Sequence, residues 1–403
     1  MKPQALFIVD NEFNRCVRLK NQIAVIASED VDCHIVEFRY FGYKPLEQRS
    51  VMGLNVYTVN APKILQNFRA LSAELPVFTW FVKNRLMSIV SKYQISPAIV
   101  HCYNTFAWEA VSGFIRKRSA DKKPQLVIDF AEDLPSIMRE YDYVKRGIGR
   151  WLVKLHKWDK LQERAVHGAD LCIVVTDEAA TDYCQRYRVE RSKFLCINNL
   201  PNEALINQSQ AAKQSNNTSF TLLYFGDTSV RRGTDLLIRT AAEIRLTIPT
   251  YEILIIGHNN REQAKLKNMI ETHQCKSFVH LMGYQPEIDL PKYMARSNMG
   301  VSPLKRNPHH DTTHANKLFQ FMLGGLPLIV SDCIAQANLV RSHNLGVVFE
   351  ADNDSNFIET VINAHNDQNQ LECWKVNVKS YIDKHFLESD IKPYVELIRC
   401  TQG

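Results

Sequence analysis

Two arginines and a glycine follow an apolar run in YFGDTSVRRGTDLLI, at residues 224–238. The run is typical of a strand that ends at Gly226, and Thr234 is a plausible N-cap for a helix after the loop. Guanidinium groups and the free N–H groups of a helix N-terminus both complement phosphate oxygens. Arg231 and Arg232 therefore suit a diphosphate, although two arginines in a loop more often form a solvated face.

A second stretch, HHDTTHANKLFQFMLGGLPLIVSD at residues 309–332, predicts a polar loop, a helix and a strand. Thr313 is the expected N-cap, and Gly324 with Gly325 indicates the C-terminal end of the helix. The N-terminus of this helix would offer a second anion site at the same rim.

The loop of the second stretch also holds four side chains that could bind a metal: His309, His310, Asp311 and His314. These residues do not have the spacing of a complete metal-ligand set, and a solvent-facing loop that closes over a bound ligand is the preferred interpretation. No metal site is predicted.

Short β-branched runs alternate with longer amphipathic stretches along the chain, which predicts parallel sheets with helices on both faces. The expected strands of the first half are 5–10, 33–38, 54–59, 98–103, 125–130, 171–176 and 194–198. Those of the second half are 220–225, 251–257, 278–283, 299–303, 327–332 and 345–350.

The composition changes at the polar segment 201–219, which we interpret as a linker. The predicted fold class is α/β, with two doubly wound Rossmann-like domains at 1–200 and 220–385 that face a cleft. A C-terminal helix at 386–403 is expected to pack back on the first domain. Ligands of open α/β sheets bind at the carboxyl ends of the strands, so the function is expected in the cleft.

Composition narrows the class of protein. A chain of 403 residues with 45% hydrophobic and 23% charged residues suits two or three globular domains and excludes general disorder. The ten scattered cysteines form no CxxC pair, and no stretch reads as a signal peptide or membrane span. We therefore expect a cytoplasmic protein that does not span a membrane. Residues 1–198 hold 14 Lys and 15 Arg against 22 Asp and Glu, a net charge of +7.

The order of the blocks in the second half resembles the nucleotide-sugar half of retaining glycosyltransferases of the GT-B architecture, in family four (glycosyl transferases group 1). The matching blocks are YEILIIG, FVHLMGY, YMARSNMGVSP, NKLFQFMLGGLPLIVSD and LGVVF, within residues 220–350. The first half resembles the family more weakly, through IVHCYN, VIDFAEDLP, GADLCIVVT and KFLCINNLPN.

The resemblance implies a role for each matching position. Arg232 stands where the family has the Lys that contacts the donor diphosphate. Gln320 and Thr312 stand where the family has the two glutamates of its E-x7-E pair, and Asp227 stands where many members have an Arg. The implied donor-binding residues are Gly226, Arg231, Arg232, Gly257, Asp311, Thr312, Thr313, His314, Asn316, Lys317 and Gln320.

Candidates on the acceptor side lie in the first half. His101 ends an expected strand, where the family often keeps a polar residue, although a lone His there is as often a core residue. Asp129, Glu132 and Asp133 follow the next strand, and they could orient or deprotonate an acceptor hydroxyl or form a capping cluster. We take His101, Asp129, Glu132 and Arg232 as the candidate catalytic residues.

Residues 145–160, KRGIGRWLVKLHKWDK, carry six basic residues and one acidic residue. As one helix they would place Trp151, Leu155 and Trp158 on a shared face, which suits an anionic membrane surface. A helix packed on the sheet with a solvated basic side is an equal alternative.

The function that the resemblance implies is transfer of a sugar, of the hexosyltransferase type, from a nucleotide-diphosphate sugar to a saccharide or lipid-linked saccharide. We expect no cofactor and no nucleic-acid partner. We expect a role in polysaccharide or glycoconjugate synthesis. The alternatives are a GT-B-type nucleotide-sugar epimerase and a degenerate, non-catalytic paralogue.

Overall fold

The computed structural model describes residues 2–40, 46–51, 53–116, 123–139, 144, 149–200, 218–257 and 260–401. The chain forms two compact units, one of residues 1–198 with 387–403 and one of residues 199–386. We call them unit 1 and unit 2. Most of the predicted linker, residues 201–217, lies outside the described residues.

The sheet of unit 1 has the order β3-β4-β2-β1-β5-β6-β7-β8. Its strands are β1 (Gln4–Val9), β2 (Asp32–Arg39), β3 (Glu47–Val51), β4 (Leu54–Asn60), β5 (Ile99–Tyr103), β6 (Gln125–Phe130), β7 (Leu171–Val174) and β8 (Phe194–Cys196). All pairs are parallel except β3 with β4. The sequence predicted every strand but β3, because this edge strand, EQRSV, is polar and largely exposed.

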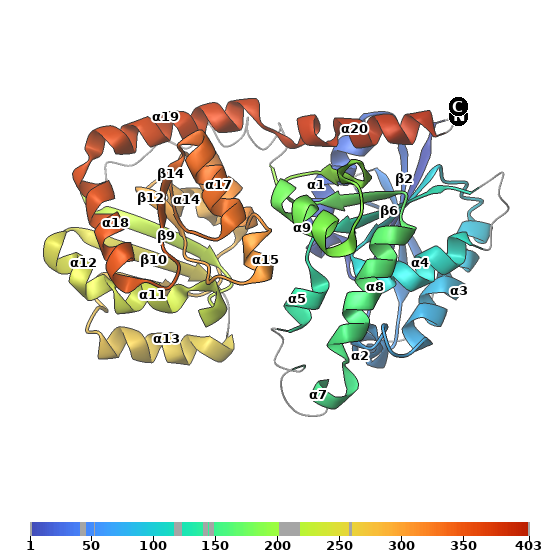
Figure 1. The fold of residues 1–403 in the computed structure, drawn as a ribbon, viewed down its shortest axis with the longest axis horizontal. Helices are drawn as coiled ribbons and strands as arrows, with labels where there is room; N and C mark the ends of the chain where they lie inside the picture. Colours follow the sequence, from blue (N-terminus) through green and yellow to red (C-terminus); the bar gives the residue numbers. More distant parts are fainter. Residues whose placement is uncertain are drawn as a thin grey trace. The chain divides into compact units, whose positions relative to one another are not determined.

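Helices cover both faces of this sheet (Figure 1). They are α1 (Val17–Ser28), α2 (Lys63–Ala70), α3 (Val77–Lys92), α4 (Trp108–Ile115), α5 (Leu134–Met138), α7 (Gly149–Leu152), α8 (Leu155–Gly168), α9 (Asp177–Tyr187) and α20 (Leu387–Cys400). Leu6 and Ile8 of β1 share a core with α3, α4 and α8. The intervening residue Phe7 contacts His101, whose ring contacts Tyr394 of α20 on the opposite face.

The predicted amphipathic helix over residues 145–160 is wrong. Residues 145–148 lie outside the described part of the chain, and the rest is divided into α7 and α8 because Lys154 has an extended backbone. Trp158 is fully buried and packs edge-on against Phe106 with 5.2 Å between ring centroids, whereas Trp151 is 80% exposed. The two tryptophans therefore do not share a face.

The sheet of unit 2 is wholly parallel, with the order β11-β10-β9-β12-β13-β14. Its strands are β9 (Phe220–Gly226), β10 (Tyr251–Gly257), β11 (Val279–Met282), β12 (Met299–Ser302), β13 (Leu328–Ser331) and β14 (Gly346–Phe349). Each lies at a predicted position, since strands buried on both faces are marked by continuous apolar runs. The predicted fold class of two doubly wound α/β units is confirmed.

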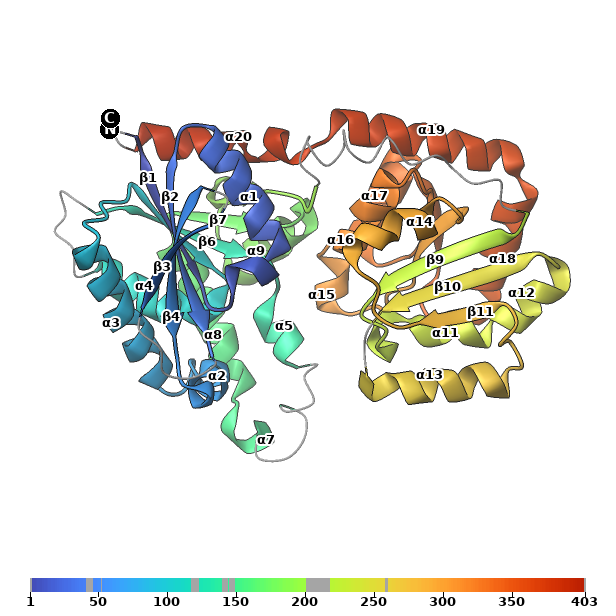
Figure 2. The ribbon, with the colours of Figure 1, turned by 180° about the vertical axis from the view of Figure 1, so that it is seen from behind.

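Nine helices are described in unit 2, and Figure 2 shows several of them from the other side. They are α11 (Thr234–Arg239), α12 (Ala241–Thr247), α13 (Asn260–Thr272), α14 (Leu290–Met294), α15 (Pro308–Asp311), α16 (Asn316–Leu323), α17 (Ile334–His343), α18 (Asp354–Asn366) and α19 (Gln368–Lys384).

The ends of α11 and α16 differ in part from the prediction. Gly324 ends α16 and Gly325 follows with φ +72°, as predicted. The N-cap positions are Gly233 for α11 and Ala315 for α16, so the predicted threonine caps are wrong. Thr234 instead donates its hydroxyl to Thr228 O at 2.9 Å, inside the preceding loop.

The strand orders locate the point in each sheet where ligands of doubly wound folds bind. In unit 1 the connection direction reverses between β1 and β5, and in unit 2 it reverses between β9 and β12. At both points two neighbouring loops leave the carboxyl ends of adjacent strands in opposite directions. These two switch points are where the predicted site residues must be sought.

Replacement of Gly300 by Ala should destabilise unit 2. A Cβ on this β12 residue would lie 2.3 Å from the ring of Phe321 in α16, so the ring or the helix must shift. We expect a loss of about 1–3 kcal/mol, the usual cost of overpacking a core, and a lower melting temperature by calorimetry. Gly283→Ala is the matched control, since nothing lies within 4 Å of its Cβ position. Equal melting temperatures for the two variants would contradict this account.

Candidate functional site

The loop after β9 is held against the loop after β12 at the switch point of unit 2. Gly233 has φ +76°, and a Cβ there would lie 1.7 Å from Pro303 O, so the two loops meet backbone to backbone. Gly226 has φ +120°, and among the described residues only the Lys317 side chain has atoms within 4 Å of its Cβ position. Space for a ligand therefore remains in front of Gly226. Gly257 is a packing residue, since its Cβ would lie 1.8 Å from Gly226 O.

Asp227 organises the loop between Gly226 and Gly233. Its carboxylate accepts hydrogen bonds from Ser229 N and Oγ, both at 3.0 Å. Its Oδ2 also lies 3.1 Å from Arg231 Nη2 and 4.0 Å from Arg232 Nε. The acidic residue therefore compensates part of the positive charge at the position where the family has an Arg.

His310 of α15 supports Arg232 from the other loop, and the sequence did not identify it as a site residue. Its Nδ1 lies 2.7 Å from Lys305 O and 3.0 Å from Asn307 Nδ2, and we assign the ring proton to Nδ1 because the shorter contact is to an oxygen that can only accept and Arg232 can only donate to Nε2. Nε2 is then an acceptor and lies 3.4 Å from Arg232 Nη1. Burial lowers the pKa of His310 to about 4, so the ring is neutral at pH 7.

Lys317 places a buried amine beside these groups. Its Nζ lies 3.8 Å from the centroid of the Tyr224 ring and has no hydrogen-bond partner among the described residues. Burial, reinforced by the charge of Arg232, holds the pKa of this amine well below its usual range, and Asp227 opposes the shift. A buried cationic donor without an acceptor is costly unless a ligand completes it. The amine is therefore a candidate donor to an anionic ligand.

The other predicted donor-binding residues surround the N-terminus of α16. Asn316, its first residue, is exposed, and Gln320 lies one turn further along at half-buried depth. Thr312 donates its hydroxyl to Pro308 O, and Thr313 is half-buried. His314 is buried, with Nε2 3.2 Å from Ala335 O. Asp311 pairs with Arg306 and accepts from Ile334 N at the start of α17.

The His and Asp side chains of this loop do not converge on one point. His310 bonds to Lys305 O, His314 to Ala335 O and Asp311 to Arg306. Within the described ranges, no three His, Cys, Asp or Glu side chains are grouped as metal ligands.

A pocket of about 700 Å³ lies at the switch point of unit 1, and the sequence did not predict it. Asp10 and Asn11 follow β1, while Tyr103 and Asn104 end β5 and begin the next loop. The remaining lining residues come from the segment before α1, from α2, from the loops after β5 and β6, and from the end of α7: Cys16, Gln66, Asn67, Arg69, Ala70, Leu71, Phe106, Glu132, Leu152 and Val153. Four carboxamides and two aromatic rings make this lining suited to a saccharide.

An ion pair forms the floor of the pocket. Arg69 Nη1 lies 3.0 Å from Asp10 Oδ2, and the guanidinium stacks over Phe106 at 4.6 Å. Burial raises the pKa of Asp10, and the charge of Arg69 opposes this rise. Asn104 adopts φ +64°, and its Oδ1 is buried without a hydrogen-bond partner among the described residues. An acceptor is thus left available beside a fixed charge pair.

The predicted acceptor-side residues separate into two places. Glu132 lines the pocket, but His101 and Asp129 lie in the core on the α1 and α20 face, both with no exposed surface. His101 Nδ1 lies 2.9 Å from the Tyr394 hydroxyl, and burial lowers the pKa of the ring to about 4. Asp129 pairs with Arg18 at 3.4 Å. Because both side chains are buried, His101 and Asp129 stabilise the core of unit 1 and have no direct access to a substrate.

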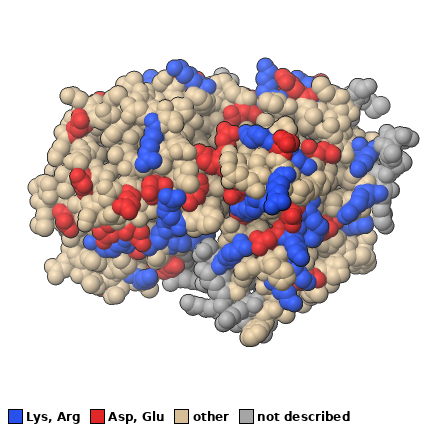
Figure 3. All heavy atoms as spheres, in the orientation of Figure 1, with Lys and Arg blue, Asp and Glu red and all other residues tan. Residues whose placement is uncertain are grey.

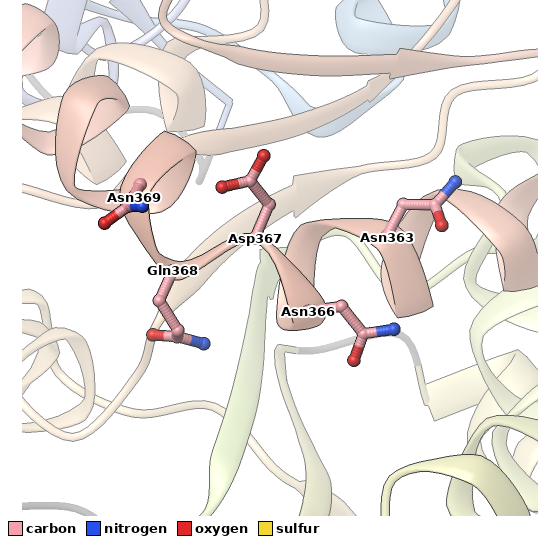
Figure 4. A pocket seen from close by; sticks show the side chains of 5 residues that line it. All are labelled: Asn363, Asn366, Asp367, Gln368 and Asn369. Carbon is pink, nitrogen blue, oxygen red and sulfur yellow. The ribbon is translucent and has the colours of Figure 1, made fainter.

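A hollow of about 580 Å³ at the α18–α19 turn is rich in carboxamides but lies away from the switch point of unit 2. It is lined by Asn363, Asn366, Asp367, Gln368 and Asn369, whose side chains point in different directions (Figure 4). The neighbouring His365 contacts Phe220, the first residue of β9. The hollow is therefore at the amino edge of the sheet, opposite Lys317.

Comparisons with known proteins identify a family match in unit 2 and solved structures with the same fold. Residues 219–367 match the model of a family described as glycosyl transferases group 1. No curated protein matches the sequence. A sucrose-phosphate synthase from Thermosynechococcus elongatus has a similar structure at 13% identity, with a TM-score of 0.73 over 99% of this chain and 98% of that chain.

Two further solved structures share the fold. The α,α-trehalose 6-phosphate synthase of Burkholderia multivorans is 9% identical, with a TM-score of 0.71 over 100% of this chain and 99% of that chain. HepE from Anabaena, solved in complex with UDP, is 14% identical, with a TM-score of 0.68 over 98% of both chains. The chain has the predicted GT-B fold.

Lys317→Met should weaken nucleoside-diphosphate binding about tenfold or more, since a charge-assisted hydrogen bond contributes roughly 1.5–3 kcal/mol. The pKa of the amine is lowered in the empty domain and must rise when an anion arrives, so binding takes up a proton. Affinity for UDP or GDP should therefore fall as pH rises from 7 to 9, above the phosphate pKa.

Calorimetry in buffers of different ionisation enthalpy measures the proton uptake directly. The proton uptake should disappear in Lys317→Met and persist in Lys292→Met, whose amine lies exposed on α14. Binding without proton uptake in the unmodified protein would contradict a role for this amine.

Proposed function

Residues 219–367 form a domain of the group 1 glycosyl transferases, and from this premise we propose that the chain transfers a sugar from a nucleotide-diphosphate sugar to a saccharide hydroxyl with retention of anomeric configuration. The predicted enzyme class, a glycosyltransferase, is confirmed by the domain and the fold. The observation that carries the finer proposal is the buried amine of Lys317 beside Arg232 at the start of α16.

The diphosphate of the donor is the proposed ligand of this cluster. Negative charge develops on the diphosphate as the sugar departs, and fixed cationic donors stabilise it most strongly where water is excluded. Arg232 is oriented by His310 and Lys317 by the Tyr224 ring, so both donors are placed before the ligand arrives. The free N–H groups at the N-terminus of α16 add to the same field.

Gln320 is the proposed ribose contact. Its amide oxygen can accept from ribose hydroxyls as a carboxylate does, but without charge, at a cost of about 1 kcal/mol. Thr312 donates its hydroxyl to Pro308 O within its own turn. Backbone groups of residues 312–314 or the side chain of Asp311 would take the place of the first family glutamate at the sugar. This departure is the specific observation that favours the second candidate, a non-catalytic paralogue.

The unit 1 pocket is the proposed acceptor site, with Glu132 orienting the attacking hydroxyl. Its carboxamides and the stacked Arg69–Phe106 pair provide hydrogen bonds and a flat surface for a sugar ring. An epimerase of the same fold would need no acceptor pocket. HepE with UDP and glucose, and a TarM variant of S. aureus with UDP and α-GlcNAc-glycerol, are structural neighbours whose ligands fit this proposal.

We further propose that the product belongs to a polysaccharide or glycoconjugate and that the reaction takes place in the cytoplasm at a membrane surface.

Arg232→Ala should lower turnover about 10²–10³-fold, the usual effect of removing one donor to a developing charge. The assay first selects a donor from a nucleotide-sugar panel by thermal shift and then measures diphosphate release with and without saccharide. Arg341→Ala, an exposed Arg on α17, should leave turnover unchanged. Nuclear magnetic resonance of the first product should show the anomeric configuration of the donor.

Release of diphosphate without an acceptor, together with epimerised sugar, would indicate the epimerase instead. Failure of every nucleotide at millimolar concentration to bind would indicate the non-catalytic paralogue.

Asn67→Ala should raise the acceptor KM about tenfold while the donor KM stays the same, since this exposed carboxamide lines only the unit 1 pocket. Gln185→Ala, an exposed carboxamide on α9, is the matched control. A change in donor KM, or no change in either constant, would place the acceptor elsewhere.

A further inference from the structure

Exposed apolar side chains gather on one region of unit 1. They lie on α2, α3, α7 and the turn before α3: Ile64, Leu75, Val77, Trp80, Trp151 and Leu152. We call this set the docking surface. Trp80 is 68% exposed and Trp151 is 80% exposed, whereas the other described tryptophans, Trp108, Trp158 and Trp374, are buried. Large aromatic side chains in contact with water are uncommon unless they bind something.

Contacts join these elements into one surface. Lys154 N, just after α7, donates to Glu74 Oε1 at 2.7 Å, which ties α7 to the turn before α3. Leu152 lines the pocket together with Ala70 and Leu71 at the end of α2. Figures 1 and 2 both show α2 and α7 at the lower edge of unit 1. The two exposed tryptophans therefore belong to neighbouring elements.

The solvent face of α3 extends the surface with helical spacing. Val77, Trp80, Asn84 and Met87 follow one another at three- or four-residue intervals and are all exposed. Helix α3 has no acidic residue, and its basic residues are Lys83, Arg85 and Lys92. Residues 63–92 hold five basic residues, of which Arg69 is paired with Asp10, against one acidic residue, Glu74, which is bonded to Lys154 N.

On the face that Figure 3 shows, Lys and Arg lie among Asp and Glu, as on an ordinary solvated surface. The docking surface combines exposed tryptophan with basic side chains and little acid, which fits the interface of an anionic bilayer, where indole rings and cationic side chains both bind. No helix in the described part of the chain is long and apolar enough to cross a membrane.

We propose that Ile64, Leu75, Val77, Trp80, Trp151 and Leu152 insert into the headgroup region of an anionic membrane. This surface replaces the one predicted over residues 145–160, because Trp158 belongs to the core. Leu152 lies both on the docking surface and in the pocket, so the pocket opens beside the bilayer. The acceptor is accordingly a saccharide carried on a lipid, an extension that rests on the proposed function, whereas the docking itself does not.

Sedimentation of the full-length protein with vesicles tests the docking without any substrate. The protein should bind vesicles of phosphatidylcholine with 30% phosphatidylglycerol at least tenfold more strongly than pure phosphatidylcholine, and salt should weaken the binding. Tryptophan fluorescence should shift to the blue on binding, because Trp80 and Trp151 leave water. Trp80→Ala with Trp151→Ala should reduce binding at least tenfold and remove the shift.

The matched control replaces two exposed apolar residues of unit 2, Leu246→Ala with Ile288→Ala, and should bind like the unmodified protein. Absence of anionic-vesicle binding, or binding that the double tryptophan variant retains, overturns the proposal. Light scattering gives a second way to overturn the proposal. If the unmodified protein forms a stable dimer and the double tryptophan variant is a monomer, the surface joins two copies of the chain.

Activity assays separate this proposal from the proposed function. With a soluble saccharide acceptor, the double tryptophan variant should turn over at the normal rate, and with the lipid-linked acceptor in vesicles it should be about tenfold slower. Vesicle binding without any sugar transfer would leave the docking surface intact and refute the proposed function. Transfer without vesicle binding would refute the docking surface alone.

Discussion

The buried amine of Lys317 is the constraint on which the donor half depends. A cation in a protein interior needs an acceptor or a ring face, and here only the Tyr224 ring serves among the described residues. Arg232 raises the local positive charge, and Asp227 offsets part of it. Burial and Arg232 lower the pKa of the amine in the empty unit 2, so a diphosphate would bind with uptake of a proton at Lys317. Gly226 and Gly233 leave room for that ligand and bring the two loops together.

The same topological rule explains both halves of the chain. In each unit the functional candidates lie where strand connections reverse, between β9 and β12 and between β1 and β5. At the switch point of unit 2 lie basic side chains and a helix N-terminus, and this combination suits an anion. Unit 1 fills its switch point with carboxamides, aromatic rings and a compensated Asp10–Arg69 pair, which suits neutral polyols. One architecture thus provides two chemically different candidate sites.

Patterns local in sequence could be predicted, and long-range pairings could not. Continuous apolar runs marked thirteen strands, and the block order led to the loop of Arg232 and to α16. The polar edge strand β3 has no such run. His310 and Arg232 are 78 residues apart, and Asp10 and Arg69 are 59 apart, so no spacing rule relates them. Trp151 and Trp158 show the limit of helical periodicity, since two non-helical residues, Val153 and Lys154, separate the helix of an exposed ring from the helix of a core ring.

Asp227 changes what the departures from the family mean. A loop with an Arg at this position would add a third cation to Arg232 and Lys317, whereas Asp227 binds Arg231 and the Ser229 N–H instead. A diphosphate must then compete with this carboxylate for Arg231, while Arg232 and Lys317 remain directed to the ligand by His310 and Tyr224. With the neutral Gln320 replacing a glutamate nearby, negative charge has moved from the helix α16 to the loop after β9. Asp227 therefore shapes the loop, which favours a retained ligand site with altered sugar contacts over a lost one.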